Sequence, residues 1–157
     1  MPFDFLSISG HKIRAPKGCG AMFIRRGTEI APLFFGGTQD RGRRPGTENV
    51  AFAVGLARAA ELAIAEREAE WNRLEQLRDR LEQAIVVGVP DVMVHGRGTR
   101  RAPHVLNVSV PGTDSESLPM ALDLQGVACS AGSACQSGTA DPSYVLSACG
   151  VRPDLAA

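Results

Sequence analysis

The sequence contains very little lysine. Of its 157 residues, 17 are lysine or arginine, and only Lys12 and Lys17 are lysines, so the other 15 are arginines. Arginine keeps its charge and binds anions, whereas a lysine amine can lose its proton and condense with an aldehyde. Any imine chemistry in this protein therefore has only two candidate side chains.

Several other features are scarce or absent. The 17 acidic residues balance the 17 basic ones, so the composition does not indicate a nucleic-acid surface. No apolar stretch approaches the ~20 residues needed to span a bilayer. The first residues carry no basic region of the kind that begins a secretory signal. We therefore expect a cytoplasmic protein with enough chain to bury a core.

The cysteines do not form a metal-binding pattern. There are four, and no two have CxxC spacing or a histidine at zinc-finger spacing: Cys19, Cys129, Cys135 and Cys149. We expect free thiols in a reducing compartment. Cys135 differs from the others because small residues surround it from Ser130 to Ala140. Such a segment packs poorly, so we expect a mobile loop.

The N-terminal part predicts two strands. Residues 5–8 and 21–24 are short apolar runs joined by a turn, and we expect both to be buried strands. Lys12 follows the first strand, beside Ser9 and His11. These residues permit two interpretations: a solvated lysine at a strand end, or an amine held against a phosphorylated aldehyde cofactor.

A long irregular segment and a long helix follow. Residues 27–46 are rich in glycine and contain the basic cluster Arg41–Arg44, which is either a solvated loop or an anion site near Thr47. Thr47 is expected to cap a helix over residues 49–85. The apolar residues of its second half are spaced by threes and fours: Trp71, Leu74, Leu77, Leu81 and Ile85. A helix about 55 Å long links two domains or packs against a partner.

The remaining residues alternate between strand and helix patterns. We expect strands at 91–94, 105–110 and 127–129, a helix at Ser115–Leu124 capped by Asp114, and a helix near 142–149. This alternation indicates an α/β fold. We place a domain boundary near residue 85, which gives domains 1–85 and 86–157.

Several segments, in order along nearly the whole chain, resemble the class V aminotransferases, which use pyridoxal phosphate (PLP). They are residues 9–12 (SGHK), 15–18 (APKG) and 44–49 (RPGTEN). Within that family, residues 106–109 (LNVS), 130–135 (SAGSAC) and 141–146 (DPSYVL) resemble the cysteine desulfurases. The SAGSAC segment is similar to their long-loop branch, which serves iron–sulfur cluster and nitrogenase assembly, although Ala131 stands where serine is common.

The resemblance implies a role for five residues. Lys12 would carry PLP, and Ser9 and His11 would bind its phosphate. Thr47 would reach the phosphate of the neighbouring subunit in a homodimer. Cys135 would be the nucleophile that accepts sulfur as a persulfide, and a possible ligand of a cluster shared with a scaffold protein. Together these residues imply a fold-type I PLP-dependent transferase.

The implied reaction removes sulfur from L-cysteine to give L-alanine and an enzyme persulfide for iron–sulfur cluster assembly, with a scaffold or other sulfur-acceptor protein as partner. The family's pyridine-binding aspartate, ring-stacking histidine and carboxylate-binding arginine have no counterpart here. We therefore expect an incomplete copy: the rear part of the large domain, a long linking helix and a small C-terminal α/β sandwich domain. Apolar surface on residues 5–24 and 49–85 should consequently be exposed.

Two alternatives remain. The chain could belong to a selenocysteine lyase or to another class V aminotransferase. In a plain transaminase, Cys135 would be dispensable. It could also be a non-catalytic fragment that acts as an interaction module.

Overall fold

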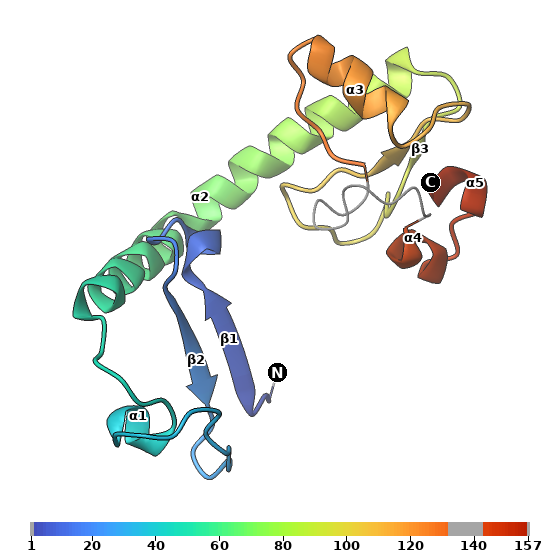
Figure 1. Ribbon diagram of the computed structural model, residues 1–157. Helices are drawn as coiled ribbons and strands as arrows, with labels where there is room; N and C mark the ends of the chain where they lie inside the picture. Colours follow the sequence, from blue (N-terminus) through green and yellow to red (C-terminus); the bar gives the residue numbers. More distant parts are fainter. Residues whose placement is uncertain (1, 132–142, 157) are drawn as a thin grey trace. The chain divides into compact units, whose positions relative to one another are not determined.

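The structure, a computed structural model, describes residues 2–131 and 143–156 (Figure 1). Contacts divide the chain into two compact units, Met1–Glu70 and Trp71–Ala157. The elements in chain order are β1 (Phe5–Ser9), the 3-10 helix η1 (Gly10–Ile13), β2 (Gly20–Ile24), α1 (Gln39–Gly42), α2 (Val50–Gly88), β3 (Met93–Val94), β4 (Val108–Ser109), α3 (Ser117–Leu124), α4 (Tyr144–Ala148) and α5 (Pro153–Ala156). The fold is mixed α/β, as the alternating sequence pattern predicts.

The first unit is built on a two-stranded hairpin. β1 pairs antiparallel with β2, in a register that runs from Phe5 opposite Ile24 to Ser9 opposite Gly20. This confirms both predicted strands. Gly20 permits the close pairing, since a Cβ there would lie 2.6 Å from the carbonyl oxygen of Ile8.

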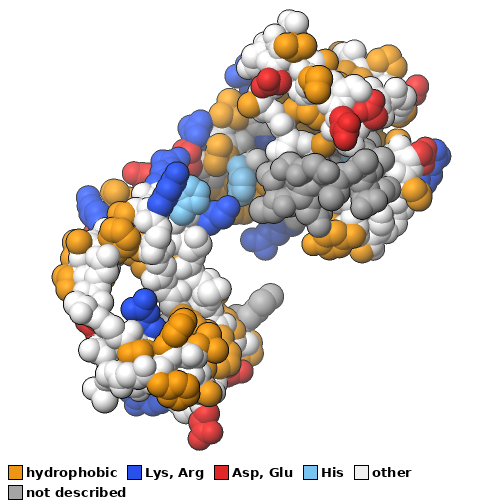
Figure 2. All heavy atoms as spheres, in the orientation of Figure 1, with side chains coloured by type: hydrophobic (Ala, Val, Ile, Leu, Met, Phe, Trp, Pro, Cys, Tyr) orange, Lys and Arg blue, Asp and Glu red, His pale blue; other side chains and the backbone are white. Residues whose placement is uncertain are grey.

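The prediction that these strands are buried is wrong for this chain. Every residue of β1 is exposed, and only Ile24 of β2 is partly covered. Figure 2 shows hydrophobic side chains gathered over the β1–β2 hairpin. Large apolar side chains are exposed on α2 as well, including Val50, Val54, Leu62 and Ile64. The expectation of exposed apolar surface on both segments is confirmed.

The long helix α2 spans 39 residues, Val50–Gly88, close to the predicted 49–85. Its capping residue differs from the prediction. The Asn49 side-chain oxygen accepts a hydrogen bond from the Phe52 backbone N–H at 3.1 Å, so Asn49 caps the helix instead of Thr47. The division between the two units falls inside α2, after Glu70. The domain boundary near residue 85 stays a prediction.

In its described residues, the second unit contains the end of α2, a short antiparallel strand pair and the short helices α3, α4 and α5. β3 pairs antiparallel with β4, with Met93 opposite Ser109 and Val94 opposite Val108. Both strands are shorter than predicted. α3 begins at Ser117 with Glu116 in the N-cap position, so the predicted Asp114 cap is wrong in register by two residues. One Asp114 carboxylate oxygen still accepts hydrogen bonds from the backbone N–H groups of Glu116 and Ser117 at the start of the helix.

The third predicted strand, residues 127–129, is wrong: these residues form no ladder. The helix predicted near 142–149 is present as α4. The backbone N–H of Ser143, just before α4, donates to the carbonyl oxygen of Ala156 in α5 at 2.8 Å. Leu155 and Ala156 are buried, so α5 contributes to the apolar core of this unit.

Buried polar side chains fasten the second unit. Glu82 of α2 is 7% exposed and pairs with Arg101 at 2.6 Å and Arg97 at 3.2 Å. Ser109 is buried, and its hydroxyl donates to the carbonyl oxygen of Leu155. Because the single hydroxyl hydrogen is used there, the His95 Nε2–H must donate to Ser109 Oγ, at 2.7 Å.

Two general predictions can be compared with the described residues. The thiols of Cys19, Cys129 and Cys149 are free, as expected. Within the described part of the chain, we find no helix with the length and hydropathy required to cross a membrane.

Candidate cofactor site around Lys12

The candidate lysine lies on a tight turn at the end of β1. Ser9 closes the strand, and His11 and Lys12 form the middle of η1. The turn is held by two backbone hydrogen bonds, from Gly10 N–H to the Cys19 carbonyl at 3.0 Å and from Ala15 N–H to the Gly10 carbonyl at 3.0 Å. Backbone hydrogen bonds therefore fix the position of Lys12, whose own side chain is exposed.

Gly10 is required by this geometry. A Cβ at this position would lie 2.8 Å from the Cys19 carbonyl oxygen, 2.8 Å from Cys19 Sγ and 3.1 Å from Ala15 Cβ. The Cys19 carbonyl is the acceptor that closes the turn, so it cannot move away without loss of that hydrogen bond. The thiol is held in turn by the Pro16 carbonyl, at 2.9 Å.

The three predicted cofactor ligands of this turn are accessible. The side chains of Ser9, His11 and Lys12 are exposed, and no described residue hydrogen-bonds to them. An amine, a hydroxyl and an imidazole thus stand within four consecutive residues at a strand end. This donor set fits an aldehyde that carries a phosphate, because the amine suits the carbonyl group and the other two groups suit the anion.

Helix α2 supports the turn from beneath. A Cβ on Gly55 would lie 3.0 Å from both Cγ and Cδ of Pro16, and one on Gly18 would lie 3.5 Å from the Phe52 ring. Ala15, next to Pro16 in sequence, and Ala59, one turn after Gly55, are buried. The segment that follows Lys12 therefore packs against the first turns of α2.

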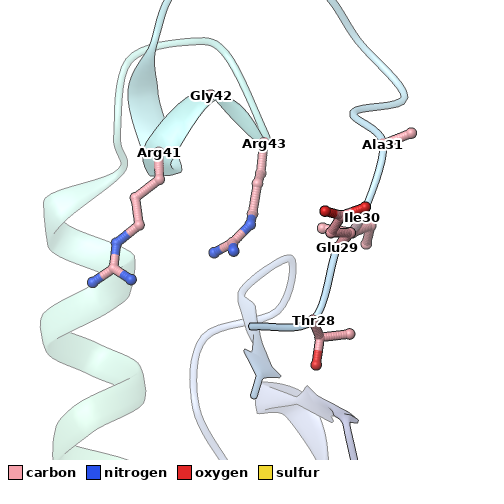
Figure 3. Close-up of a pocket in the computed structure, with 7 residues that line it drawn as sticks. All are labelled: Thr28, Glu29, Ile30, Ala31, Arg41, Gly42 and Arg43. Atoms are coloured by element: carbon pink, nitrogen blue, oxygen red, sulfur yellow. The ribbon is translucent and has the colours of Figure 1, made fainter. Parts of the chain in front are cut away.

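The structure does not join Thr47 to this turn by any bond among the described residues. Thr47 is exposed and precedes the Asn49 cap of α2. Arg41, Gly42 and Arg43 line an open hollow of about 480 Å³, together with Thr28, Glu29, Ile30 and Ala31. In Figure 3, Arg41 of α1 and Arg43, which follows α1, extend in the same direction, opposite the segment 28–31. Thr47 does not line this hollow, so the choice between a solvated loop and an anion site stays open.

Cys135, the predicted sulfur acceptor, lies outside the described residues, as does most of its loop. The expected mobility of that loop and the suggested cluster ligation stay predictions. Among the residues that the structure describes, no group of three histidine, cysteine or acidic side chains could hold a metal ion.

Sequence reasoning missed the residues that support the lysine turn. Gly55 stands inside an alanine-rich helical stretch, where glycine is less favourable than alanine. That local conflict was the available signal, because such a glycine usually has a packing or functional reason. Its partner, Pro16, could not have been identified from spacing alone.

Comparisons with known proteins show which family the chain resembles. The profile of the family described as Aminotransferase class-V matches residues 1–152. A cysteine desulfurase of Trichormus azollae is 47% identical over 94% of this chain, and the cysteine desulfurase NifS of Azotobacter vinelandii is 45% identical over 91%. The chain spans about 37% of the length of the first of these relatives and 36% of the second.

Solved structures give the same result. The NifS-like protein of Rickettsia africae matches 98% of this chain with a TM-score of 0.82 and 29% identity, and the chain covers 39% of it. DndA of Streptomyces lividans matches 99% of the chain with a TM-score of 0.72 and 40% identity, and the chain covers 44% of it. With the family profile matched over 152 of its residues, the chain belongs to the class-V aminotransferase family, and the relatives named here include cysteine desulfurases.

Proposed function

We propose that these residues form part of a PLP-dependent cysteine desulfurase. The observation that carries the proposal is the exposed lysine turn, a backbone-closed turn at the end of β1 that contains Lys12, with Ser9 and His11 beside it. The names and identities of the relatives support the choice of reaction.

The chain's own residues would divide the work as follows. Ser9 and His11 would bind the cofactor phosphate, and the Lys12 amine would hold its aldehyde group. The chemistry that PLP supplies when bound is the withdrawal of electrons from the substrate, which weakens its carbon–sulfur bond. The Lys12 amine would also move a proton at the substrate α-carbon.

Cys135 would complete the reaction. Its thiolate attacks the sulfur of L-cysteine, a sulfur–sulfur bond forms, and the carbon–sulfur bond breaks. The products are L-alanine, which keeps the carbon skeleton and gains a proton at the former thiol carbon, and a Cys135 persulfide. We further propose that the persulfide passes to an iron–sulfur scaffold or another acceptor protein, and that Cys135 can ligate a cluster shared with it.

Thr47 would serve a second copy of the chain. The resemblance implies that it binds the phosphate in the neighbouring subunit, and its exposed position before α2 leaves its hydroxyl accessible. The proposed assembly is therefore a homodimer in which each phosphate site draws on both protomers.

The lysine assignment can be tested by incubation of the chain with PLP, borohydride reduction and peptide mass mapping. We expect a stoichiometric adduct on Lys12, and loss of that adduct in Lys12→Ala. Lys17→Ala is the matched control, because Lys17 is the only other lysine and is also exposed. Labelling shared equally between the two lysines would contradict the proposal.

The sulfur-transfer step has a separate test. In an intact desulfurase that contains this sequence, Cys135→Ser should abolish sulfur release while cofactor attachment to Lys12 is retained. Retained sulfur release would reject the role of Cys135. Competition between substrates would separate a cysteine desulfurase from a selenocysteine lyase or another class V aminotransferase.

A second candidate is an interaction module without catalytic activity of its own. The observation that favours it is the exposed apolar surface of β1, β2 and α2, which suits association with another protein surface. It predicts that the isolated chain forms no stoichiometric Lys12 adduct.

A further inference from the structure

Gly55 is an unexpected residue at its position. It lies in the second turn of α2, among alanine and other helix-forming residues. Glycine is among the least favourable residues in a helix interior, and alanine is the most favourable. A glycine here requires a reason that outweighs its effect on the helix.

The structure supplies such a reason in the close approach of Pro16. A Cβ at position 55 would lie 3.0 Å from both Cγ and Cδ of the proline ring, closer than ordinary van der Waals contact. Gly88, in the last position of the same helix, differs: a Cβ there would meet nothing within 4 Å. The two glycines of α2 therefore stand in opposite environments.

A short series of contacts leads from Gly55 to the lysine turn. The Pro16 carbonyl accepts hydrogen bonds from the Cys19 thiol at 2.9 Å and the Cys19 backbone N–H at 3.4 Å. The Cys19 carbonyl accepts from Gly10 N–H, and the Gly10 carbonyl accepts from Ala15 N–H, each at 3.0 Å. These last two bonds enclose the residues from Gly10 to Ala15, and Lys12 lies among them.

We infer that Gly55 is a positioning residue for Lys12. Because Gly55 has no side chain, the Pro16 ring packs closely against α2, and this packing holds the turn that presents the Lys12 amine. A side chain at position 55 displaces Pro16 by a few tenths of an ångström and shifts the hydrogen-bonded turn with it. The role of Gly55 in the reaction rests on the proposed function, but the packing of Pro16 against Gly55 is a property of the free chain.

The test compares four variants of the full chain: Gly55→Ala, Gly88→Ala, Pro16→Ala and the double variant Gly55→Ala with Pro16→Ala. The first readout is amide hydrogen exchange of Ala15, whose N–H closes the turn on Gly10. The second is the rate of Lys12 adduct formation with PLP and borohydride. Chemical denaturation checks that each variant is folded.

We expect Gly55→Ala to speed Ala15 exchange and to slow Lys12 labelling by about three- to tenfold, because small misplacements of a reactive group have large rate effects. Its unfolding midpoint should be unchanged or raised, since alanine favours the helix. Gly88→Ala should leave both readouts at the wild-type values. Removal of the proline ring in the double variant should restore both readouts to those of Pro16→Ala alone.

Equal Ala15 exchange and equal Lys12 labelling in Gly55→Ala and Gly88→Ala would overturn the inference. The same holds if the double variant differs from Pro16→Ala alone, because the effect of the added methyl group would then not pass through the Pro16 ring. Failure of the wild-type chain to label at Lys12 counts against the proposed function instead. Amide exchange of Ala15 still decides whether Gly55 positions the turn.

Discussion

Different kinds of contact stabilise each of the two compact units of this chain. In Met1–Glu70, close contacts depend on glycines, which have no side chain. Gly10, Gly20 and Gly55 allow backbone or proline atoms to approach closely. In Trp71–Ala157, they depend on polar side chains that are wholly or partly buried, chiefly Glu82 and Ser109. The first unit exposes apolar strands, whereas the second buries α5 residues.

The difference explains how each unit can serve a site. Backbone contacts fix Lys12 without packing around its side chain, so the amine remains accessible on a defined turn. Buried ion pairs and hydrogen bonds instead fix segments that are distant in sequence, such as residue 109 and the C-terminal residues 155–156. We therefore expect the second unit to be sensitive to loss of single polar groups and the first to be insensitive to it.

The largest effect should come from Glu82→Ala. This change leaves Arg101, whose side chain is 17% exposed, without its carboxylate partner, and also releases Arg97. Breaking a buried ion pair from one side costs about 3 kcal/mol of unfolding free energy. Denaturant titration, with hydrogen exchange to locate the change, would measure it.

The matched control lies in the first unit. Arg58 and Glu61 pair at 3.0 Å with both side chains 66% exposed, so Glu61→Ala should cost below about 0.5 kcal/mol. Equal losses for the two glutamates would remove the proposed contrast between the units.

Ser109→Ala should have the next largest effect. It removes the hydroxyl that donates to the Leu155 carbonyl and accepts from His95, so a buried carbonyl and an imidazole N–H each lose a partner. The expected loss is about 2 kcal/mol. Faster exchange of the Ser143 amide, which bonds to Ala156, would show that α5 has loosened. Ser7→Ala, on the exposed strand β1, should stay within about 0.5 kcal/mol of the wild type.

The smallest effect concerns pH. Burial lowers the pKa of His95 below its ordinary value of 6.5. The unfolded chain therefore binds this proton more readily than the folded one. The stability that neutral His95 contributes should be fully present above about pH 6.5. It should be lost as the pH drops through the lowered pKa of the folded state.

The variant His95→Gln tests this dependence, because a glutamine amide can donate to Ser109 without titrating. Unfolding measured between about pH 7 and pH 5 should show a weaker slope in the variant than in the wild type. Identical slopes would indicate that other groups cause the pH dependence.

The sequence alone determined the local elements and the family. Apolar runs predicted β1 and β2, apolar spacing predicted α2 to within a few residues, and the ordered motifs around Lys12 indicated the class V aminotransferases. These features depend on residues close together in the chain, whose periodicity and turn chemistry are visible in the sequence.

Only the tertiary structure decided which distant groups meet. It selected Asn49 over Thr47 as the helix cap, placed Pro16 against Gly55, and connected His95 and Ser109 to Leu155. It also left the predicted strand at 127–129 unpaired. Pairing and packing depend on the positions of segments that lie far apart in sequence, and no local pattern encodes those positions.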